Sequence, residues 1–285
     1  MSIKINHLTH IYNEGTTFEK VALNDVNIEI KTGEFIGLIG HTGSGKSTLI
    51  QHLNGIISPT HGEILLDDEN IHKDKAKLKE LRRRIGLAFQ YPEYQLFEMT
   101  VYKDVAFGPT NLGWSKEKIH ESVVDALNIV GISPEIYEKS PFELSGGQKR
   151  RVAIAGVIAM EPEVLILDEP TAGLDPVGRE DVLQNIENYR KAKNATIMMV
   201  SHSMNDVARL ADRLLVMCNA HLAMDGTPGE VFEHAQELLD MGLDIPEITR
   251  VFLKLQQKGL PVKQVYTIEQ AVAELKRLKE GTVHA

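Results

Sequence analysis

The sequence predicts an α/β fold with a parallel core sheet and helices on both faces of that sheet. Four short apolar runs indicate it, because continuous apolar strands are typical of sheets that are covered on both sides. They are EFIGLIG ending at Gly40, IGLAFQ ending at Gln90, VLILDE ending at Asp168 and Glu169, and TIMMVSH ending at His202. Helices are expected at 46–54, 115–130, 145–160 and 176–192. Since ligand sites in open α/β sheets lie beyond the carboxyl ends of the strands, we expect the polar residues that end these runs at one edge.

Two further regions flank this predicted core. Residues 1–30 alternate between apolar and polar side chains, which is typical of short, half-buried strands joined by a turn. After residue 226 the apolar residues follow helical spacing instead. The two stripes are Ile248, Val251, Phe252 and Leu255, then Ile268, Ala271, Val272 and Leu275 behind an N-cap at Thr267. We therefore expect a main domain at 1–226 and a small helical extension at 227–285, whose stripes form its own core rather than a partner surface.

Composition excludes several classes of function. The 285 residues include 31 basic and 40 acidic side chains, a net charge of −9, which argues against nucleic acid or an anionic lipid surface as the main partner. The longest apolar run, at 152–160, is half of the roughly 18 residues that span a bilayer. The N-terminus lacks a signal-peptide core, and one cysteine excludes an internal disulfide. We expect a cytoplasmic protein that meets a membrane only through another protein.

The stretch GHTGSGKST matches the phosphate-loop pattern G-x-x-x-x-G-K-[ST], placed after a strand and before a helix. Its residues are Gly40, His41, Thr42, Gly43, Ser44, Gly45, Lys46, Ser47 and Thr48. The glycines let backbone N–H groups surround a phosphate, Lys46 reaches the β- and γ-phosphate oxygens, and the Ser47 hydroxyl binds Mg²⁺. The loop predicts that the chain binds a nucleoside triphosphate.

Polar residues at three other strand ends suit phosphoryl chemistry. Asp168 is placed to hold Mg²⁺ through its water shell, and Glu169 is placed to orient and deprotonate an attacking water. The alternative is that both acids cap the next helix. His202 is positioned to touch the γ-phosphate, and Gln90 to reach the metal or the water. By themselves, a structural histidine and a surface glutamine would be the simpler interpretations.

The stretch LSGGQ predicts a second anion-binding helix start. Ser145 as N-cap and Gln148 three residues later form a capping box, and Gly146 and Gly147 leave their N–H groups bare. The helix behind them is apolar around its circumference, so we expect it to be buried and rigid. Because the phosphate loop already surrounds its own triphosphate, a second cradle is redundant unless it closes over a nucleotide that another molecule holds.

The ordered set GHTGSGKST, Gln90, LSGGQ, LILDEP, GLD at 173–175 and His202 resembles the ATP-binding-cassette ATPases over about residues 1–226. The resemblance implies a P-loop NTPase fold with an N-terminal antiparallel β subdomain and a helical signature subdomain at about 91–160. It also implies that LSGGQ contacts the γ-phosphate bound by the opposite subunit, in a head-to-tail pair. Tyr12 would stack on adenine, although a core strand tyrosine is the alternative. Asp175 would lie at the dimer seam, although it could equally N-cap the helix begun by Pro176.

A narrower resemblance lies in FQYPEYQLFEMTVYKDVAFGPTNLG. Six of the 15 Phe and Tyr residues fall between 89 and 107, which predicts an apolar surface groove, with a subdomain core as the alternative. The run resembles the ATPase subunits of energy-coupling-factor transporters, which are bacterial vitamin and metal-ion importers. YPEYQLFE and FGPTNLG favour the second of two paralogous subunits that pair as a heterodimer, with a homodimer as the alternative.

This narrower resemblance implies an ATP-hydrolysing subunit that uses ATP and Mg²⁺ at the cytoplasmic face of the cell membrane. The groove near 91–107 would accept a coupling helix of a transmembrane scaffold subunit, while a separate membrane protein captures the substrate. The extension 227–285 is similar to that family's C-terminal extension and is expected to contact the dimer partner. Two rival classes are a cassette ATPase acting on DNA or ribosomes and a P-loop nucleotide kinase. Neither is favoured, because no fused second cassette or basic patch is visible and a kinase has no use for LSGGQ.

Overall fold

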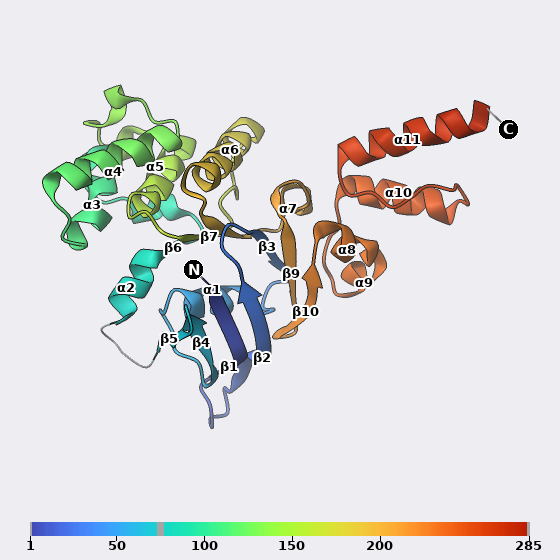
Figure 1. Ribbon diagram of the computed structural model, residues 1–285, viewed down its shortest axis with the longest axis horizontal. Coiled ribbons are helices and arrows are strands. Elements are labelled where there is room, and N and C mark those ends of the chain that lie inside the picture. The colour runs from blue at the N-terminus through green and yellow to red at the C-terminus, as the bar shows by residue number, and fades with distance from the viewer. Residues whose placement is uncertain (1, 73–76, 284–285) are drawn as a thin grey trace. The chain divides into compact units, whose positions relative to one another are not determined.

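The structure is a computed structural model that describes residues 2–72 and 77–283. It divides into two compact units. The first unit comprises Met1–Glu34 and Ser47–Val200, and the second comprises Phe35–Lys46 and Ser201–Ala285. Figure 1 shows their helices and strands. Within the described ranges, no helix is both long and apolar enough to cross a membrane.

The first unit begins with a four-stranded antiparallel sheet in the order β2-β1-β4-β5. The strands are β1 (Ile3–Tyr12), β2 (Lys20–Ile30), β4 (His61–Leu66) and β5 (Glu69–Asn70). Ile3 pairs with Ile30 on one side and with Leu66 on the other, and all three side chains are buried. The alternation in residues 1–30 therefore predicts β1 and β2 correctly, whereas β4 and β5 lie outside that region.

Three parallel strands form the second layer of the first unit. They are β6 (Ile85–Ala88), β7 (Val164–Asp168) and β8 (Thr196–Val200), with β7 paired to both neighbours. Every residue of β8 and the first four residues of β7 are buried, as expected for apolar runs covered on both faces.

The helices of the first unit include the four predicted from sequence, and their ends agree within two residues. The unit contains α1 (Lys46–Leu53), α2 (Lys77–Arg84), α3 (Val101–Asn111), α4 (Lys116–Ile129), α5 (Gly146–Ile158), α6 (Pro176–Lys193), and the 3₁₀ turns η1 (Pro92–Gln95), η2 (Pro134–Ile136) and η3 (Pro141–Glu143). Helices α3, α4 and α5 pack on one another as a helical cluster (Figure 1). The sequence patterns did not predict α2 and α3.

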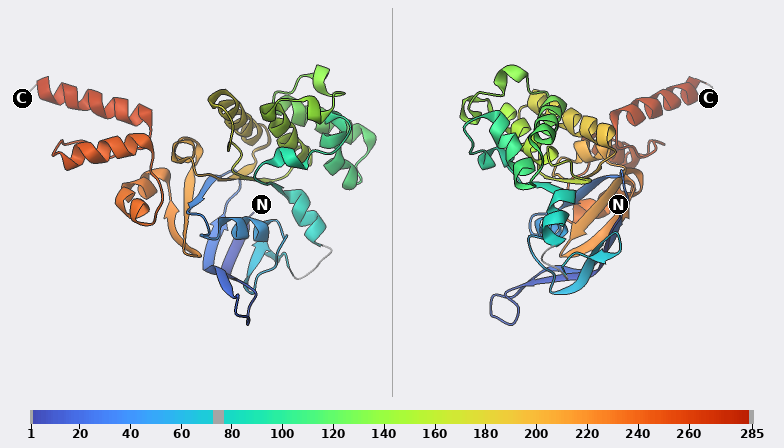
Figure 2. Two further views of the ribbon diagram at one scale, coloured as in Figure 1. Left: turned by 180° about the vertical axis from the view of Figure 1, so that it is seen from behind. Right: turned by 60° about the vertical axis from the view of Figure 1, so that its left-hand side comes forward.

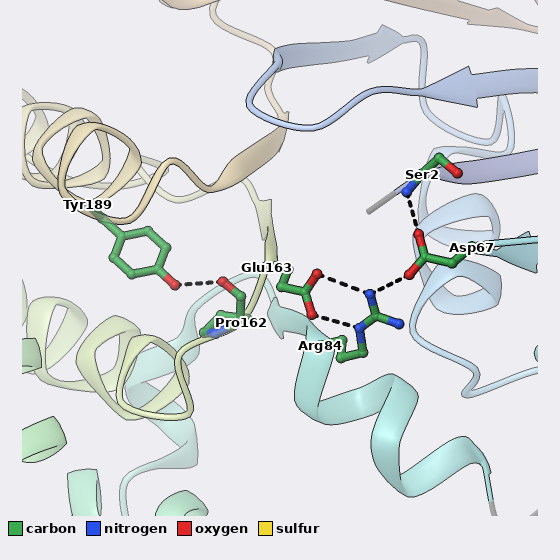
Figure 3. A network of polar contacts seen from close by, with 6 residues as sticks. All are labelled: Ser2, Asp67, Arg84, Pro162, Glu163 and Tyr189. Carbon is green, nitrogen blue, oxygen red and sulfur yellow. Dashed lines mark hydrogen bonds and ion pairs between the residues drawn. The ribbon is translucent and has the colours of Figure 1, made fainter.

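A polar network holds the antiparallel sheet of the first unit to its parallel strands (Figure 3). The Arg84 guanidinium, at the end of α2, donates hydrogen bonds to Glu163 at 2.7 and 3.0 Å and to Asp67 at 2.6 Å. Asp67 lies between β4 and β5 and also accepts a hydrogen bond from the Ser2 backbone. The hydrogen bond from Arg84 lowers the pKa of the Asp67 carboxyl group. Glu163 immediately precedes β7, so the network anchors the strand that carries Asp168.

The second unit contains the strands β3 (Phe35–Gly40), β9 (Arg213–Cys218) and β10 (His221–Gly226). Strand β3 runs parallel to β9, and β10 runs antiparallel to β9. Its helices are α7 (Met204–Leu210), α8 (Pro228–Glu233), α9 (Ala235–Asp240), α10 (Glu247–Gln257) and α11 (Ile268–Val283). Helices α10 and α11 run side by side (Figures 1 and 2).

The two C-terminal apolar stripes form their own core only in part. Phe252 and Ala271 are buried together with Val262 and Val265 from the connecting segment, and Ile248, Leu255 and Leu278 pack against them. The other members, Val251, Val272, Leu275 and Ile268, are roughly half exposed or more. The prediction that both stripes are internal is therefore wrong for these four. The connecting segment supplies part of the core, so each helix buries only a narrow edge.

Candidate nucleotide-binding site

The phosphate loop runs from the end of β3 into α1, and its glycines are required by its geometry. A Cβ atom at Gly40 would collide with the Met217 carbonyl oxygen and lie 2.5 Å from the Ser44 hydroxyl. Gly43 and Gly45 have φ angles of 81° and 108°, in the left-handed region that favours glycine. Nothing lies within 4 Å of a Cβ placed at Gly43, so the loop leaves open space there.

Lys46 is buried at the start of α1. Its Nζ donates hydrogen bonds to the Gly40 carbonyl at 2.6 Å and to the His41 carbonyl at 3.0 Å. The Ser44 backbone also bonds to the His41 carbonyl, at 3.1 Å. These bonds fold the loop around the lysine, which holds the positive charge at the place where phosphates are expected. His41 is half-buried, whereas Thr42 and Gly43 are exposed.

The next two loop residues differ in exposure. Ser47 is exposed, whereas Thr48 is buried. The Thr48 hydroxyl lies 3.3 Å from the Tyr12 hydroxyl, which brings the predicted adenine contact to the first turn of α1. Tyr12 is 37% exposed and therefore is not the core strand tyrosine of the alternative interpretation.

Asp168 is the last residue of β7, Glu169 follows it directly, and Gln90 lies just past the end of the parallel neighbour β6. The first unit therefore brings these three residues to one edge of its parallel strands, as predicted. The Glu169 backbone is left-handed, with φ of 50°, and its N–H donates to the Val200 carbonyl at 3.0 Å. Such a backbone in a non-glycine residue costs on the order of 1–2 kcal/mol and is common at functional sites.

The helix after these acids is capped by another residue. Asp175 accepts a hydrogen bond from the Gly178 backbone at 2.7 Å and is the N-cap of α6, so Asp168 and Glu169 do not cap this helix. Asp175 is exposed. Its capping role does not test whether it lies at a dimer seam, so that location stays a prediction. His202 is exposed and lies in the second unit, as do loop residues 40–46.

The signature helix start has the predicted capping box. The Gln148 N–H donates to the Ser145 hydroxyl at 3.3 Å, and the Ser145 N–H donates to the Gln148 side chain at 3.0 Å. A Cβ at Gly146 or Gly147 would meet nothing within 4 Å, so both glycines border open space. This geometry suits an anion at the N-terminus of α5.

Helix α5 is not buried all round, which corrects the expectation from its apolar sequence. The side that carries Ala153, Gly156 and Val157 is half-buried and lines a groove, together with Met160 just past the end of the helix. The reason is that α3 and α4 cover α5 only in part, and the small residues on this side leave space between α3 and α5.

The groove has a volume of about 750 Å³ and lies on the first unit, where the aromatic-rich segment predicted it. Its walls come from α2, α3, α5 and the segment 95–97. Phe97 and Phe107 are both about half exposed, and their rings meet edge to face at 4.9 Å. Arg82, Arg83 and Asp104 add charged groups to the apolar walls.

Sequence analysis missed Arg150, which follows LSGGQ by two residues and is 2% exposed. Its guanidinium pairs with Glu93 and donates to the Pro170 and Ala172 carbonyls, directly behind Glu169. The guanidinium also lies 5.5 Å from the Tyr91 ring centroid. No local signal distinguished it, because Arg150 stands between Lys149 and Arg151 in a basic run at the start of α5, and only its burial shows that this charge requires partners.

The fold and this set of motifs define a cassette ATPase, and comparison with known families agrees. The ABC transporter family matches residues 23–172, and the chain belongs to that family, within its energy-coupling factor transporter ATP-binding proteins. It is 58% identical to the energy-coupling factor transporter ATP-binding protein EcfA2 of Clostridium tetani, over 98% of this chain and 97% of that protein. It is 57% identical to EcfA2 of Clostridium perfringens, over 95% and 96%.

Solved structures support the same fold. The chain is similar to cbiO1 from Clostridium perfringens, described as part of the ABC transporter complex cbiONQ, with a TM-score of 0.76 and 38% identity over 89% of this chain and 98% of that chain. It is also similar to the dimeric cassette MJ0796 in a post-hydrolysis state bound to ADP and Pi, with a TM-score of 0.70 and 28% identity over 79% and 98%. The predicted fold class, and the predicted function of an ATPase coupled to transport, are thereby confirmed.

Proposed function

We propose that the chain binds MgATP and hydrolyses it as one of two ATPase subunits of an energy-coupling factor importer. Two nucleotides lie between the subunits, each held by the phosphate loop of one subunit and the LSGGQ helix start of the other. One observation carries this proposal. The chain has a complete phosphate loop and, separately, a capped helix start whose two glycines border open space. The solved MJ0796 cassettes, which are dimers, support a paired arrangement.

The residues present fit a magnesium nucleotide. The open space beside Gly43 accommodates a phosphate, and the Ser47 hydroxyl, Gln90 amide and Asp168 carboxylate offer the oxygen ligands that Mg²⁺ prefers. When bound, the metal neutralises charge on the β- and γ-phosphate oxygens. Lys46 exchanges its hydrogen bonds to the loop carbonyls for phosphate oxygens, and Glu169 accepts the proton of the attacking water. His202 contacts the γ-phosphate, and Tyr12 stacks on adenine.

The partners follow from two surfaces. The apolar groove of the first unit, with its half-exposed Phe97 and Phe107, accepts a coupling helix of a transmembrane scaffold subunit. Exposed apolar residues on α10 and α11, such as Val251 and Leu275, support the C-terminal extension as a contact with the second ATPase subunit. That subunit is a paralogue, and Asp175 lies at the seam. A separate membrane protein captures the transported vitamin or micronutrient, so the ATPase pair works as a peripheral complex at the cytoplasmic face.

A base variant tests the proposal. Glu169→Gln in the assembled transporter should retain ATP binding and lose turnover by about a hundredfold or more, because binding relies on the phosphate loop whereas attack needs the base. Glu135→Gln, on an exposed turn, is the matched control and should hydrolyse ATP at the parental rate. Parental turnover by Glu169→Gln would show that the assigned base is wrong.

A further inference from the structure

Four residues of the first unit form a closed circuit of contacts between β1 and α1. His10 and Tyr12 lie two positions apart on β1, and Thr48 and His52 lie one helical turn apart on α1. The His10 ring meets the Tyr12 ring edge to face at 4.5 Å and the His52 ring at 4.7 Å. Nδ1 of His52 is hydrogen-bonded to the backbone carbonyl of Thr48. The side-chain hydroxyl of Thr48 contacts the hydroxyl of Tyr12 and so closes the circuit.

The orientation of the innermost ring is fixed. Nδ1 of His52 lies 2.7 Å from the Thr48 carbonyl oxygen, and because a carbonyl only accepts, Nδ1 carries the hydrogen. His52 is fully buried, and this burial lowers the pKa of its imidazole to about 4. The ring is therefore neutral at ordinary pH and presents a rigid, uncharged surface to His10.

The histidines are not arranged to hold a metal. Nδ1 of His10 and Nε2 of His52 are both buried with no hydrogen-bond partner, as is Nε2 of the nearby His72. Yet within residues 2–72 and 77–283, no group of three or more such side chains is placed to bind a metal ion. The rings instead form a packed row, in which His52 contacts His10 and His10 contacts the half-exposed Tyr12.

We infer that His10 is a positioning residue for the nucleotide base: wedged between His52 and Tyr12, it fixes the Tyr12 ring relative to the start of α1. The inference rests on the proposed function, in which Tyr12 stacks on adenine. A tyrosine on a strand surface rotates about its side-chain bonds, and binding then has to order it. The edge-to-face contact with His10 and the hydroxyl contact with Thr48 hold the ring before the nucleotide arrives.

This role predicts a selective loss. An edge-to-face aromatic pair contributes enough to change a dissociation constant by roughly three- to tenfold. Removing the His10 ring should therefore weaken the binding of ATP, which has a base to stack on Tyr12. It should not weaken the binding of inorganic tripolyphosphate, which has no base. A variant that merely damaged the fold would weaken the binding of both ligands.

The test is calorimetric titration of the full chain with ATP and with tripolyphosphate. His10→Ala should raise the dissociation constant of ATP by about three- to tenfold and leave that of tripolyphosphate unchanged. His10→Phe keeps an aromatic edge and should restore ATP affinity. His61→Ala, which removes an exposed histidine from neighbouring β4, is the matched control and should behave as the parent.

Tyr12→Ala separates this inference from the proposed function. If Tyr12→Ala lowers the affinity for ATP but His10→Ala does not, the positioning role of His10 is wrong, and the proposed contact of Tyr12 with adenine is retained. If His10→Ala weakens ATP and tripolyphosphate equally, His10 is only structural and the inference is likewise overturned. If Tyr12→Ala leaves ATP affinity unchanged, the adenine assignment itself fails, and the inference falls with it.

Discussion

Arg150 forms a two-pronged ion pair with Glu93 in the interior of the first unit. Nε donates to Oε2 at 3.0 Å, and Nη2 donates to Oε1 at 2.6 Å. Nη1 of the same guanidinium donates to the carbonyls of Pro170 and Ala172. Glu93 belongs to η1 after Gln90, and Pro170 follows Glu169, so one buried cation joins three segments that carry predicted site residues.

Breaking this pair from one side should be strongly destabilising. Glu93→Leu leaves the Arg150 charge buried without its carboxylate, which costs about 3–5 kcal/mol of unfolding free energy. The double variant Glu93→Leu/Arg150→Met removes both charges and should recover much of that loss. Urea denaturation followed by circular dichroism measures both, and additive losses in the double variant would contradict the coupling.

The neighbouring arginine provides the matched control. Arg151 pairs with Asp181 at 2.9 Å, but Asp181 is about half exposed. An exposed pair contributes on the order of 0–1 kcal/mol, so Asp181→Leu should change the unfolding free energy far less than Glu93→Leu. Equal losses in the two variants would show that burial of the Arg150 pair is not what stabilises the unit.

Blocking the LSGGQ helix start should affect the partner's site. Ser145→Arg replaces the N-cap with a long side chain beside the open space at Gly146 and Gly147, which removes the anion site at that helix end. In an assembled pair, hydrolysis should fall at the site completed by the mutated helix. Nucleotide binding at the phosphate loop of the mutated chain should be nearly unchanged, as measured by trapping of labelled ATP on each subunit. Loss of ATP binding in the mutated chain itself would contradict the arrangement.

His52 should make the stability of the protein fall as pH is lowered. Its folded pKa of about 4 lies below the ordinary value of 6.5, because of burial and the nearby His10 and His72, so the unfolded chain binds the proton first. Stability is therefore complete above about pH 6.5 and declines towards pH 4, by roughly 3 kcal/mol from this group. His52→Gln keeps a donor for the Thr48 carbonyl and should flatten that decline in thermal melts, whereas His61→Gln should not.

The parts of the fold that could be predicted are marked by patterns within a few consecutive residues of the sequence. Ser145 and Gln148 identify the start of α5 because both partners of a capping box lie within four residues. Helix α3 was missed because Gly108 and Pro109, which normally disfavour helices, lie inside it. Helix α2 was missed because KLKELRRR is short and strongly polar, with only two leucines to mark a helical face.

The contacts that organise the site are of another kind. Arg150 and Glu93 are 57 positions apart, and His10 and His52 come from a strand and a helix that no local pattern places together. Sequence alone indicates that a buried charge needs a partner but does not say which one. The same limit applies to the C-terminal stripes, where helical periodicity could not show that Val251 and Leu275 face outward.

The groove beside α5 can be closed without disturbing the fold. A Cβ at Gly156 would meet nothing within 4 Å, and Gly156 lines the groove between α3 and α5. By contrast, a Cβ at Gly108, on the opposite wall, would lie 2.8 Å from Met160. Gly156→Leu therefore places a side chain in the groove rather than in the core. Replacing an interior helical glycine with leucine also favours the helix by up to about 1 kcal/mol, so the melting temperature should be unchanged or higher.

If the groove receives the coupling helix of a scaffold subunit, this stable variant should fail to assemble. Co-expression with the membrane components, followed by affinity purification, should recover little of the scaffold with Gly156→Leu, while the isolated subunit binds ATP normally. Glu121→Leu adds the same side chain to the exposed face of α4, outside the groove, and should co-purify as the parent does. Because the substitution adds volume on the groove side of α5, where a Cβ meets nothing within 4 Å, undiminished scaffold recovery with Gly156→Leu would mean that the coupling helix docks elsewhere.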